Sequence, residues 1–196
     1  MFRKKKKLHI YLFRHGQTTY NRDEIFTGWK DAKLTKQGIK QANTIARKLK
    51  NKKFQVAFHT RLSRSIDTLK PVLRDHPECV ALIKNDLMIE RNYGIYSGTS
   101  HETFINKRGK EEYKLIHRGW DVKIPKGENF SQVEKRVKKF IKELKKFMKK
   151  NKVSVAISAH GNSIRLFRKI WEKATIKETV SWFIPYDKIY RYTIEV

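Results

Sequence analysis

Apolar residues follow two different spacings that alternate along most of the chain. Short runs rich in β-branched and aromatic residues are typical of strands, and Val153–Ile157 is apolar at nearly every position, as expected for a central strand buried on both faces. Apolar residues that recur every three or four positions predict helices instead. Strands are predicted at Leu8–Phe13, Phe54–Phe58, Val80–Ile83, Val153–Ile157 and Ile189–Ile194, the last as an edge strand. Helices are predicted at Thr35–Lys50, Leu62–Leu73, Ser131–Lys150 and Ile164–Trp171.

Two of these helices have informative details. Thr35 is a suitable N-cap, because its hydroxyl can accept a hydrogen bond from a free backbone N–H in the first turn. The helix at Leu62–Leu73 must either continue across Pro71 or kink there. The apolar face of the first helix is predicted to consist of Ile39, Ala42, Ile45, Ala46 and Leu49.

Regular alternation of strands and helices predicts an α/β fold. We expect a three-layer α/β/α sandwich with a mainly parallel central sheet, because crossover helices cover both faces of such a sheet. The chain has no repeat and no linker-like segment, so residues 1–196 are predicted to form a single domain. The stretch from 93 to 128 has the least regular pattern and is predicted to form a lid-like segment.

Charge is the unusual feature of the composition. The chain has 46 Lys and Arg against 19 Asp and Glu, a formal net charge of +27. Such a field attracts nucleic acid, anionic lipid or a polyanionic metabolite, but it can equally reflect a general preference for surface lysine. Arg3–Lys7 is its densest cluster.

Several classes of protein are excluded or disfavoured. No apolar run approaches the roughly 20 residues needed to cross a bilayer. The run at Leu8–Phe13 follows basic residues, yet it is too short and too polar for a signal peptide. A single cysteine, Cys79, excludes an intrachain disulfide and favours a reducing compartment, so a cytoplasmic location is predicted. No Cys/His cluster has the spacing of a zinc site.

Two histidines occupy matching positions. His15 and His160 each follow an apolar strand and precede a glycine, Gly16 and Gly161. Ligands of open α/β sheets bind beyond the carboxyl ends of the strands, where both histidines should lie. Glycine there allows a sharp turn, and a helix that begins after the turn offers backbone N–H groups to an anion. The repeated pattern therefore predicts an anion-binding site with two histidines.

Five segments in collinear order resemble the histidine phosphatase superfamily, and in particular its compact cofactor-dependent phosphoglycerate mutases. The first carries the RHG motif of that superfamily, and the last resembles the second histidine motif of the mutases. The segments are RHGQT at 14–18, FTGWKDAKLT at 26–35, ERNYG at 90–94, KGENF at 126–130 with Arg136, and SAHGNSIR at 158–165.

The resemblance implies roles for individual residues. His15 would be the nucleophile that receives a phosphoryl group, and Arg14, Arg64 and His160 would bind that group. Glu90 would be the general acid and base, although an ion pair with its neighbour Arg91 is the alternative. Arg61 competes with Arg64 as the second arginine. Asn21, Gly161 and Asn162 would add hydrogen bonds to the phosphoryl oxygens.

The other end of the substrate has its own expected partners. The positions that match are Thr27, Gly28, Arg91, Tyr93, His101, His117 and Arg118. His101 and His117 replace a lysine and an arginine of the mutases, and Gln17 replaces a glutamate. A histidine with an ordinary pKa near 6.5 is mostly neutral above pH 7, so we expect the affinity for phosphoglycerate to weaken between pH 6 and pH 8.

The favoured function is therefore a phosphoglycerate mutase of glycolysis and gluconeogenesis. It would act through phosphohistidine, with 2,3-bisphosphoglycerate as the priming donor and without a metal. The segment from Asp121 to Lys126 lacks the insertion of larger mutases, and a short lid that admits water would give a phosphatase for a small phosphoester instead. A third hypothesis is a protein that binds nucleic acid or an anionic surface on an inactive scaffold. We expect a small phosphorylated substrate, no specific nucleic acid and no membrane as partners, and a homodimer is left open.

Overall fold

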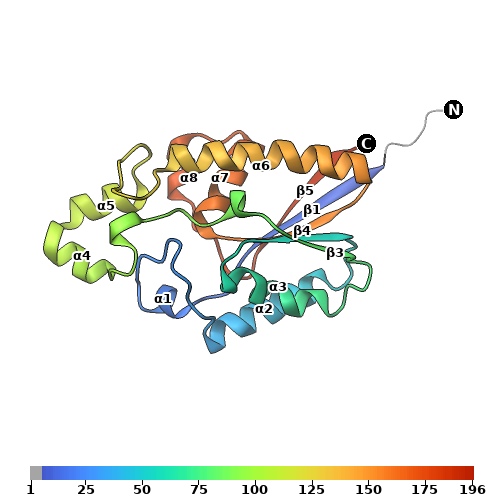
Figure 1. Ribbon diagram of the computed structural model, residues 1–196, viewed down its shortest axis with the longest axis horizontal. Helices are drawn as coiled ribbons and strands as arrows, with labels where there is room; N and C mark the ends of the chain where they lie inside the picture. The colour runs from blue at the N-terminus through green and yellow to red at the C-terminus, as the bar shows by residue number, and fades with distance from the viewer. Residues whose placement is uncertain (1–5) are drawn as a thin grey trace.

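A five-stranded sheet forms the centre of the computed structural model, which describes residues 6–196 (Figure 1). The strand order is β3-β2-β4-β1-β5. Strands β1 to β4 pair in parallel, whereas β5 lies antiparallel to β1 at one edge. The strands are β1 (Lys7–Arg14), β2 (Val56–His59), β3 (Ala81–Lys84), β4 (Val155–Ala159) and β5 (Ile189–Glu195). The mainly parallel sheet and the antiparallel edge strand confirm the predicted fold class.

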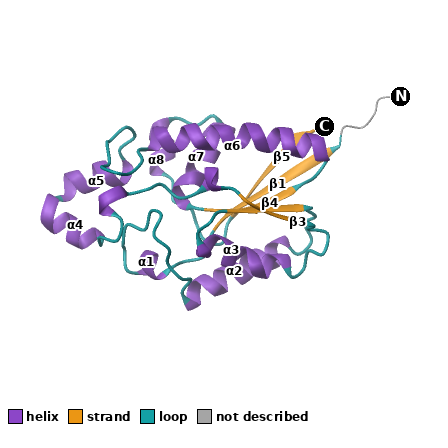
Figure 2. Cartoon of the chain, in the orientation of Figure 1, coloured by secondary structure: helices purple, strands orange, loops and turns teal. Residues whose placement is uncertain are grey.

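Helices cover both faces of this sheet and complete the three layers (Figure 2). The helices are α1 (Thr19–Arg22), α2 (Lys36–Leu49), α3 (Ser63–Leu73), α4 (His101–Arg108), α5 (Lys110–Arg118), α6 (Phe130–Asn151), α7 (Gly161–Glu172) and α8 (Ile176–Ser181), with short 3₁₀ turns η1 (Asp86–Met88) and η2 (Gly94–Tyr96). Helices α2 and α3 pack on one face, and α6 and α7 on the other. No helix within residues 6–196 is both long and apolar enough to cross a membrane.

Alternation along β1 divides the apolar core between the two faces of the sheet. Ile10 and Leu12 pack toward α6 and α7, whereas Tyr11 and Phe13 pack toward α2 and α3. Every residue of β4 is buried, as expected for the central strand of the sheet. Burial on both faces fixes the register of the two strands that end at the histidine motifs.

Strands and long helices lie where the sequence predicts them, with shifted ends. Val80 lies outside β3 and is 83% exposed, because β3 begins one residue later. Helix α3 continues through Pro71. Thr35 caps α2 by accepting from the backbone N–H of Gly38, as predicted, but Ile39 is 53% exposed. The preceding residue, Gly38, is buried instead of Ile39.

The least regular segment contains two helices that the sequence pattern does not predict. Helices α4 and α5 project beyond the end of the sheet opposite the chain termini (Figure 1). They rest on a small apolar core that shares no residue with the two cores at the sheet. Its buried members are Phe26, Tyr93, Tyr96, Phe104, Ile116 and Ile124. The predicted lid-like stretch is therefore a helical hairpin with its own packing, and whether it moves as a lid stays a prediction.

Candidate active site

Two parallel neighbours in the sheet bring the histidines together. Arg14, the last residue of β1, is paired with Ala159, the last residue of β4, so the next residue of each strand is a histidine at the same edge. The imidazole rings of His15 and His160 lie 5.0 Å apart between centroids and are 2% and 0% exposed. The turn after His15 is tight, because any side chain at Gly16 would collide with the backbone of Gly38.

His15 is held in one neutral tautomer. Its Nδ1 lies 2.7 Å from the carbonyl oxygen of Gly16, which can only accept a hydrogen bond, so Nδ1 carries the proton. Nε2 therefore keeps its lone pair. Burial lowers the pKa of His15 well below its ordinary value, and the charges of Arg64 and Arg14 lower it further. A neutral imidazole with a free nitrogen is the form that can attack phosphorus.

His160 is held by a different bond. Its Nε2 lies 2.8 Å from the hydroxyl of Thr60, and its Nδ1 is buried without a partner. Burial lowers the pKa of His160 well below the ordinary value, and Arg64 is the next largest influence. Nδ1 is therefore the ring nitrogen of His160 that no protein group occupies.

Two arginines flank the histidines. Arg14 donates from Nη1 to the carbonyl of Ile184 at 2.9 Å, and its guanidinium lies 4.0 Å from the ring centroid of Tyr186. Arg64 donates to the carbonyls of Lys30 and Gly28, each at 2.9 Å. The Nε atoms of both arginines are buried without a partner. Buried N–H groups are normally satisfied, so these donors indicate an anion between the arginines.

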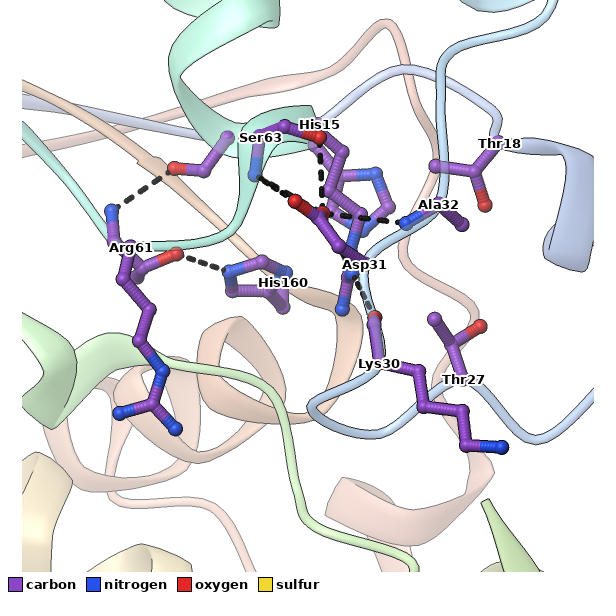
Figure 3. A network of polar contacts seen from close by, with 12 residues as sticks. His15, Thr18, Thr27, Lys30, Asp31, Ala32, Arg61, Ser63 and His160 are labelled. Atoms are coloured by element: carbon purple, nitrogen blue, oxygen red, sulfur yellow. Dashed lines mark hydrogen bonds and ion pairs between the residues drawn. The ribbon is translucent and has the colours of Figure 1, made fainter. Parts of the chain in front are cut away.

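The start of helix α3 determines which of the two arginines, Arg61 or Arg64, lies beside His15. Asp31 accepts hydrogen bonds from the backbone N–H of Ser63, at 3.0 Å, and from its hydroxyl at 2.9 Å (Figure 3). This directs Arg64, on the first turn, inward beside His15, where burial lowers its pKa only to about 10 and leaves it charged at neutral pH. Arg61 instead pairs with Asp86 at the surface, at 3.1 Å.

A cavity of about 230 Å³ is lined by Arg14 and Gly161, the chain neighbours of the two histidines. His15, His160 and Arg64 are not themselves among its lining residues. Gly28, with φ of +53°, turns the loop that forms one wall. Eleven of the predicted site residues line the cavity, namely Arg14, Asn21, Thr27, Gly28, Glu90, Tyr93, His101, His117, Arg118, Gly161 and Asn162. The structure therefore gathers most of the predicted site around one space, although the roles of these residues stay predictions.

Glu90 faces this cavity at the N-terminus of α7. Its Oε1 accepts from the backbone N–H of Arg91 at 2.7 Å and from that of Asn162 at 3.2 Å. No ion pair within 4 Å joins it to Arg91 among the described residues, so the surface ion-pair alternative has no support. Oε2 receives a longer contact from the same N–H of Asn162, at 3.5 Å, which leaves this oxygen able to exchange a proton with a ligand.

The segment that carries Glu90 is fixed from outside the cavity. Arg136 of α6 donates to the carbonyl of Glu90 at 3.1 Å and to that of Leu87 at 2.8 Å. The same guanidinium pairs with Glu128 at 2.9 Å, and Glu128 accepts from the backbone N–H of Asn92 at 3.0 Å. This half-buried ion pair explains the eight-residue spacing between Glu128 and Arg136.

Burial lowers the pKa of both substituted histidines, and for His117 this corrects the expected pH dependence. His117 and His101 pack with Tyr113 on α4 and α5, with ring centroids 5.1 to 5.3 Å apart. Burial, followed by the charge of Arg118, lowers the pKa of His117 to about 2, and burial also lowers that of His101. His117 carries no charge at pH 6 or at pH 8. The prediction that its titration weakens substrate affinity over that range is therefore wrong.

These neutral histidines should make the fold sensitive to acid. His15, His117 and His160 have lowered pKa values in the folded chain, whereas the unfolded chain protonates them near pH 6.5. Their contribution to stability is present above pH 6.5 and is lost as the pH falls below it. Each can contribute a slope of up to about 1.4 kcal/mol per pH unit.

We expect the free energy of unfolding, measured with urea, to fall between pH 6.5 and pH 5. The variant His117→Gln should show a shallower decline, by roughly the slope of one histidine. An identical decline in both proteins would contradict the buried, neutral state of His117.

Arg91 is the predicted binding residue that does not line the cavity. Its guanidinium lies 4.4 Å from the ring centroids of both Tyr93 and Phe130. It donates to the carbonyls of Ile116 and His117, at 2.8 and 3.1 Å. Arg91 therefore ties α5 to the rest of the molecule, and its predicted contact with the substrate has no support in this geometry.

Eight lining residues were not predicted as site residues: Tyr20, Glu24, Ile25, Phe26, Arg165, Phe183, Ile184 and Tyr186. Arg165 and Phe26 lie within the motifs quoted above, so their proximity to the site was available from the sequence. Phe183 and Tyr186 lie in the loop before β5, where no motif marked them. Residues 6–196 contain no group of three or more His, Cys, Asp or Glu side chains that could hold a metal ion.

Comparison with known proteins agrees with this geometry. The sequence profile of the histidine phosphatase superfamily (branch 1) matches residues 10–195, nearly the whole chain. The chain belongs to the histidine phosphatase superfamily. Members of this superfamily are enzymes, and this chain is a mutase or a phosphatase.

Curated relatives carry a mutase name. A protein of Parvibaculum lavamentivorans named 2,3-bisphosphoglycerate-dependent phosphoglycerate mutase is 34% identical over 161 residues, which cover 80% of this chain and 76% of the relative. A phosphoglycerate mutase of Schizosaccharomyces pombe is also 34% identical, over 80% of this chain and 75% of the relative.

Solved structures that share this fold include both phosphatases and a phosphoglycerate mutase. The α-ribazole phosphatase of Shigella flexneri superposes with a TM-score of 0.79 at 21% identity, over 94% of this chain and 89% of that one. A phosphoglycerate mutase of Bacillus anthracis superposes with a TM-score of 0.76 at 20% identity, over 97% and 89%. The histidine phosphatase fold alone therefore does not distinguish the two activities.

Proposed function

We propose that this histidine phosphatase superfamily member is a phosphoglycerate mutase that interconverts 2- and 3-phosphoglycerate. The observation that carries the proposal is a single cavity with cations at two places. Arg14 lines the cavity and, together with Arg64, acts on His15, although Arg64 is not a lining residue. Arg118 lines the cavity with His117. A phosphoester with a second anionic group suits such a cavity better than one without. The curated relatives named as mutases support the same choice.

The chemistry divides among residues already described. The lone pair of His15 Nε2 forms the bond to phosphorus, and the bond from phosphorus to the ester oxygen breaks. Glu90 gives a proton to the departing oxygen and later removes one from the hydroxyl that attacks the phosphohistidine. Arg14, Arg64 and His160 stabilise the charge on the equatorial oxygens during both transfers.

A priming donor fits the same residues. The unpartnered Nε atoms of Arg14 and Arg64 and the unpartnered Nδ1 of His160 are donors or acceptors for a phosphoryl group. When bound, 2,3-bisphosphoglycerate would supply that phosphoryl group to the enzyme. Arg118 is the residue that would hold the second anionic group, in keeping with the relative that is named for this dependence. No metal is proposed.

A phosphatase is the second candidate. The α-ribazole phosphatase has the same fold, and transfer of the phosphoryl group to water instead of a hydroxyl needs the same histidine and glutamate. The neutral His101 and His117 also offer less charge to a second anionic group than the lysine and arginine expected there.

From the net charge of +27 we expect only weak binding of nucleic acid. Binding of nucleic acid should be independent of sequence and lost near physiological ionic strength, because it would rest on counterion release. Apart from Lys6 and Lys7, the Arg3–Lys7 cluster lies outside the described residues. A cytoplasmic location and a role in glycolysis are part of the proposal, and a homodimer remains a prediction.

One assay separates the mutase from the phosphatase. Purified enzyme is incubated with 3-phosphoglycerate, with and without 2,3-bisphosphoglycerate, while 2-phosphoglycerate and free phosphate are measured together. We expect isomer formation to exceed phosphate release and to depend on bisphosphoglycerate. Faster release of phosphate than of isomer would reject the mutase in favour of the phosphatase.

A further inference from the structure

Arg165 is a buried cation in the cavity wall that the proposed mechanism does not use. It lies on the second turn of α7, is 4% exposed and lines the cavity. No carboxylate within 4 Å pairs with it among residues 6–196. A buried charge without a counterion is costly, and proteins rarely keep one unless something compensates it.

The protein satisfies only part of this guanidinium. Nη1 donates to Oδ1 of Asn162 and Nη2 donates to the carbonyl of Trp182, each at 2.6 Å. Nε is buried and has no partner. The two neutral acceptors fix the plane of the guanidinium without neutralising its charge, so the group is rigid and still able to bind an anion.

Arg165 shares the lining of the cavity with Arg118 and His117, whereas His15 and His160 are not lining residues. Its charge acts on His117, and Arg118 is the charge that most lowers the pKa of Arg165, to about 9 after burial. Glu90 and Arg14 also act on Arg165, and the arginines that act most on His15 and His160 are Arg64 and Arg14. Arg165 and Arg118 are thus two cations that repel each other in one part of the cavity. An anion bound to both would relieve that repulsion.

We propose that Arg165 is a specificity-determining residue that, with Arg118, binds a second anionic group on the substrate, opposite the phosphoryl group that His15 receives. The inference rests on the proposed function, because phosphoglycerate supplies a carboxylate at that place. It also explains how two neutral histidines can occupy positions where mutases carry cations. The carboxylate is recognised by two arginines that line the cavity, one from α5 and one from α7.

A matched pair of ligands tests this assignment. 3-Phosphoglycerate and sn-glycerol 3-phosphate share the phosphate and the three-carbon chain, but only the first carries a carboxylate. Their dissociation constants are measured by calorimetry on enzyme without bisphosphoglycerate. We expect Arg165→Met to weaken binding of 3-phosphoglycerate by about 30-fold or more, and that of glycerol phosphate by no more than about threefold.

Two further variants make the result interpretable. Arg168→Met is the control on the same helix, since Arg168 pairs with Glu172 and packs on Trp182; it should change neither constant. Arg165→Lys keeps a charge but loses the fork of donors, so it should weaken 3-phosphoglycerate selectively and by less. If Arg165→Met does not fold, this variant decides.

The outcomes that overturn the proposal are distinct. Equal weakening of both ligands would mean that Arg165 acts through Asn162 and the phosphate, and no weakening would mean that it does not bind the substrate. The mutase proposal fails separately, if the parent enzyme does not isomerise. If Arg165→Met then still loses affinity for 3-phosphoglycerate selectively, the result supports Arg165 and Arg118 as a binding site for an anionic group. If the parent is an active mutase but Arg165→Met weakens both ligands equally, only the role proposed for Arg165 is rejected.

Discussion

Replacing His15 with alanine is expected to abolish turnover, with a loss on the order of 10⁴-fold or more. The neutral imidazole, held by Gly16 with Nε2 unprotonated, is the only group at the carboxyl end of β1 that can carry the phosphoryl group. Incubation of the parent enzyme with bisphosphoglycerate should give a phosphate label that is acid-labile and alkali-stable. The label should map to the peptide that contains His15 and be missing from the variant.

The control for this experiment is a second histidine, His9, on strand β1. His9 occupies the opposite end of β1, where its Nδ1 bonds the hydroxyl of Thr193 at 3.0 Å, so His9→Ala should keep its label and its turnover. Label on His160, or normal turnover by His15→Ala, would contradict the assignment of the nucleophile.

Glu90→Gln is expected to lower turnover by about 10²–10⁴-fold, the usual contribution of a positioned general acid. The amide oxygen can still accept from the backbone N–H groups of Arg91 and Asn162, so the local structure should persist. What the variant loses is the proton for the departing ester oxygen. The measurement is steady-state isomerisation of 3-phosphoglycerate, with melting temperature as a check on folding.

A donor with a good leaving group should distinguish chemistry from structure. Such a donor needs little protonation, so Glu90→Gln should phosphorylate His15 from it with a much smaller defect. Glu134→Gln, which removes a carboxylate that pairs with Lys169 on the outer side, is the control and should retain activity. Isomerisation by Glu90→Gln within a few-fold of the parent would show that Glu90 is structural.

The sequence predicted the layout of the site better than its details. The repeated strand-His-Gly pattern places His15 and His160 together because adjacent parallel strands end at the same edge. The sequence favoured Arg64 by resemblance alone and left Arg61 as a competitor, because the two arginines are only three positions apart. The choice depends on Asp31, a residue 32 positions from Ser63 that caps the start of α3.

The sequence also could not show how deeply titratable and charged side chains are buried. The expected titration of His117 used the pKa of an exposed histidine, whereas packing against His101 and Tyr113 and the nearby Arg118 keep it neutral. Arg91 was expected in the site from its motif, but it donates to the carbonyls of Ile116 and His117 and does not line the cavity.

Local pattern also limited the prediction of the fold. Helix α4 buries only Phe104, so it has no apolar stripe to detect, and α1 is a single turn without buried residues. Ile39 fits the helical spacing of α2, yet the loop at Gln17 comes so close to the helix that only the glycine at position 38 fits beneath it.

Because α4 and α5 pack on an apolar core of their own, local detachment of these helices can be distinguished from unfolding of the whole molecule. Phe104 and Ile116 belong to a cluster that shares no residue with those that hold the sheet, so this part can detach at a free-energy cost below that of unfolding the molecule. Detachment would uncover His101 and His117 while β1 and β4 keep His15 and His160 in register. The residence time of a product could therefore change by substitution of a few aromatic side chains, while the melting temperature stays the same.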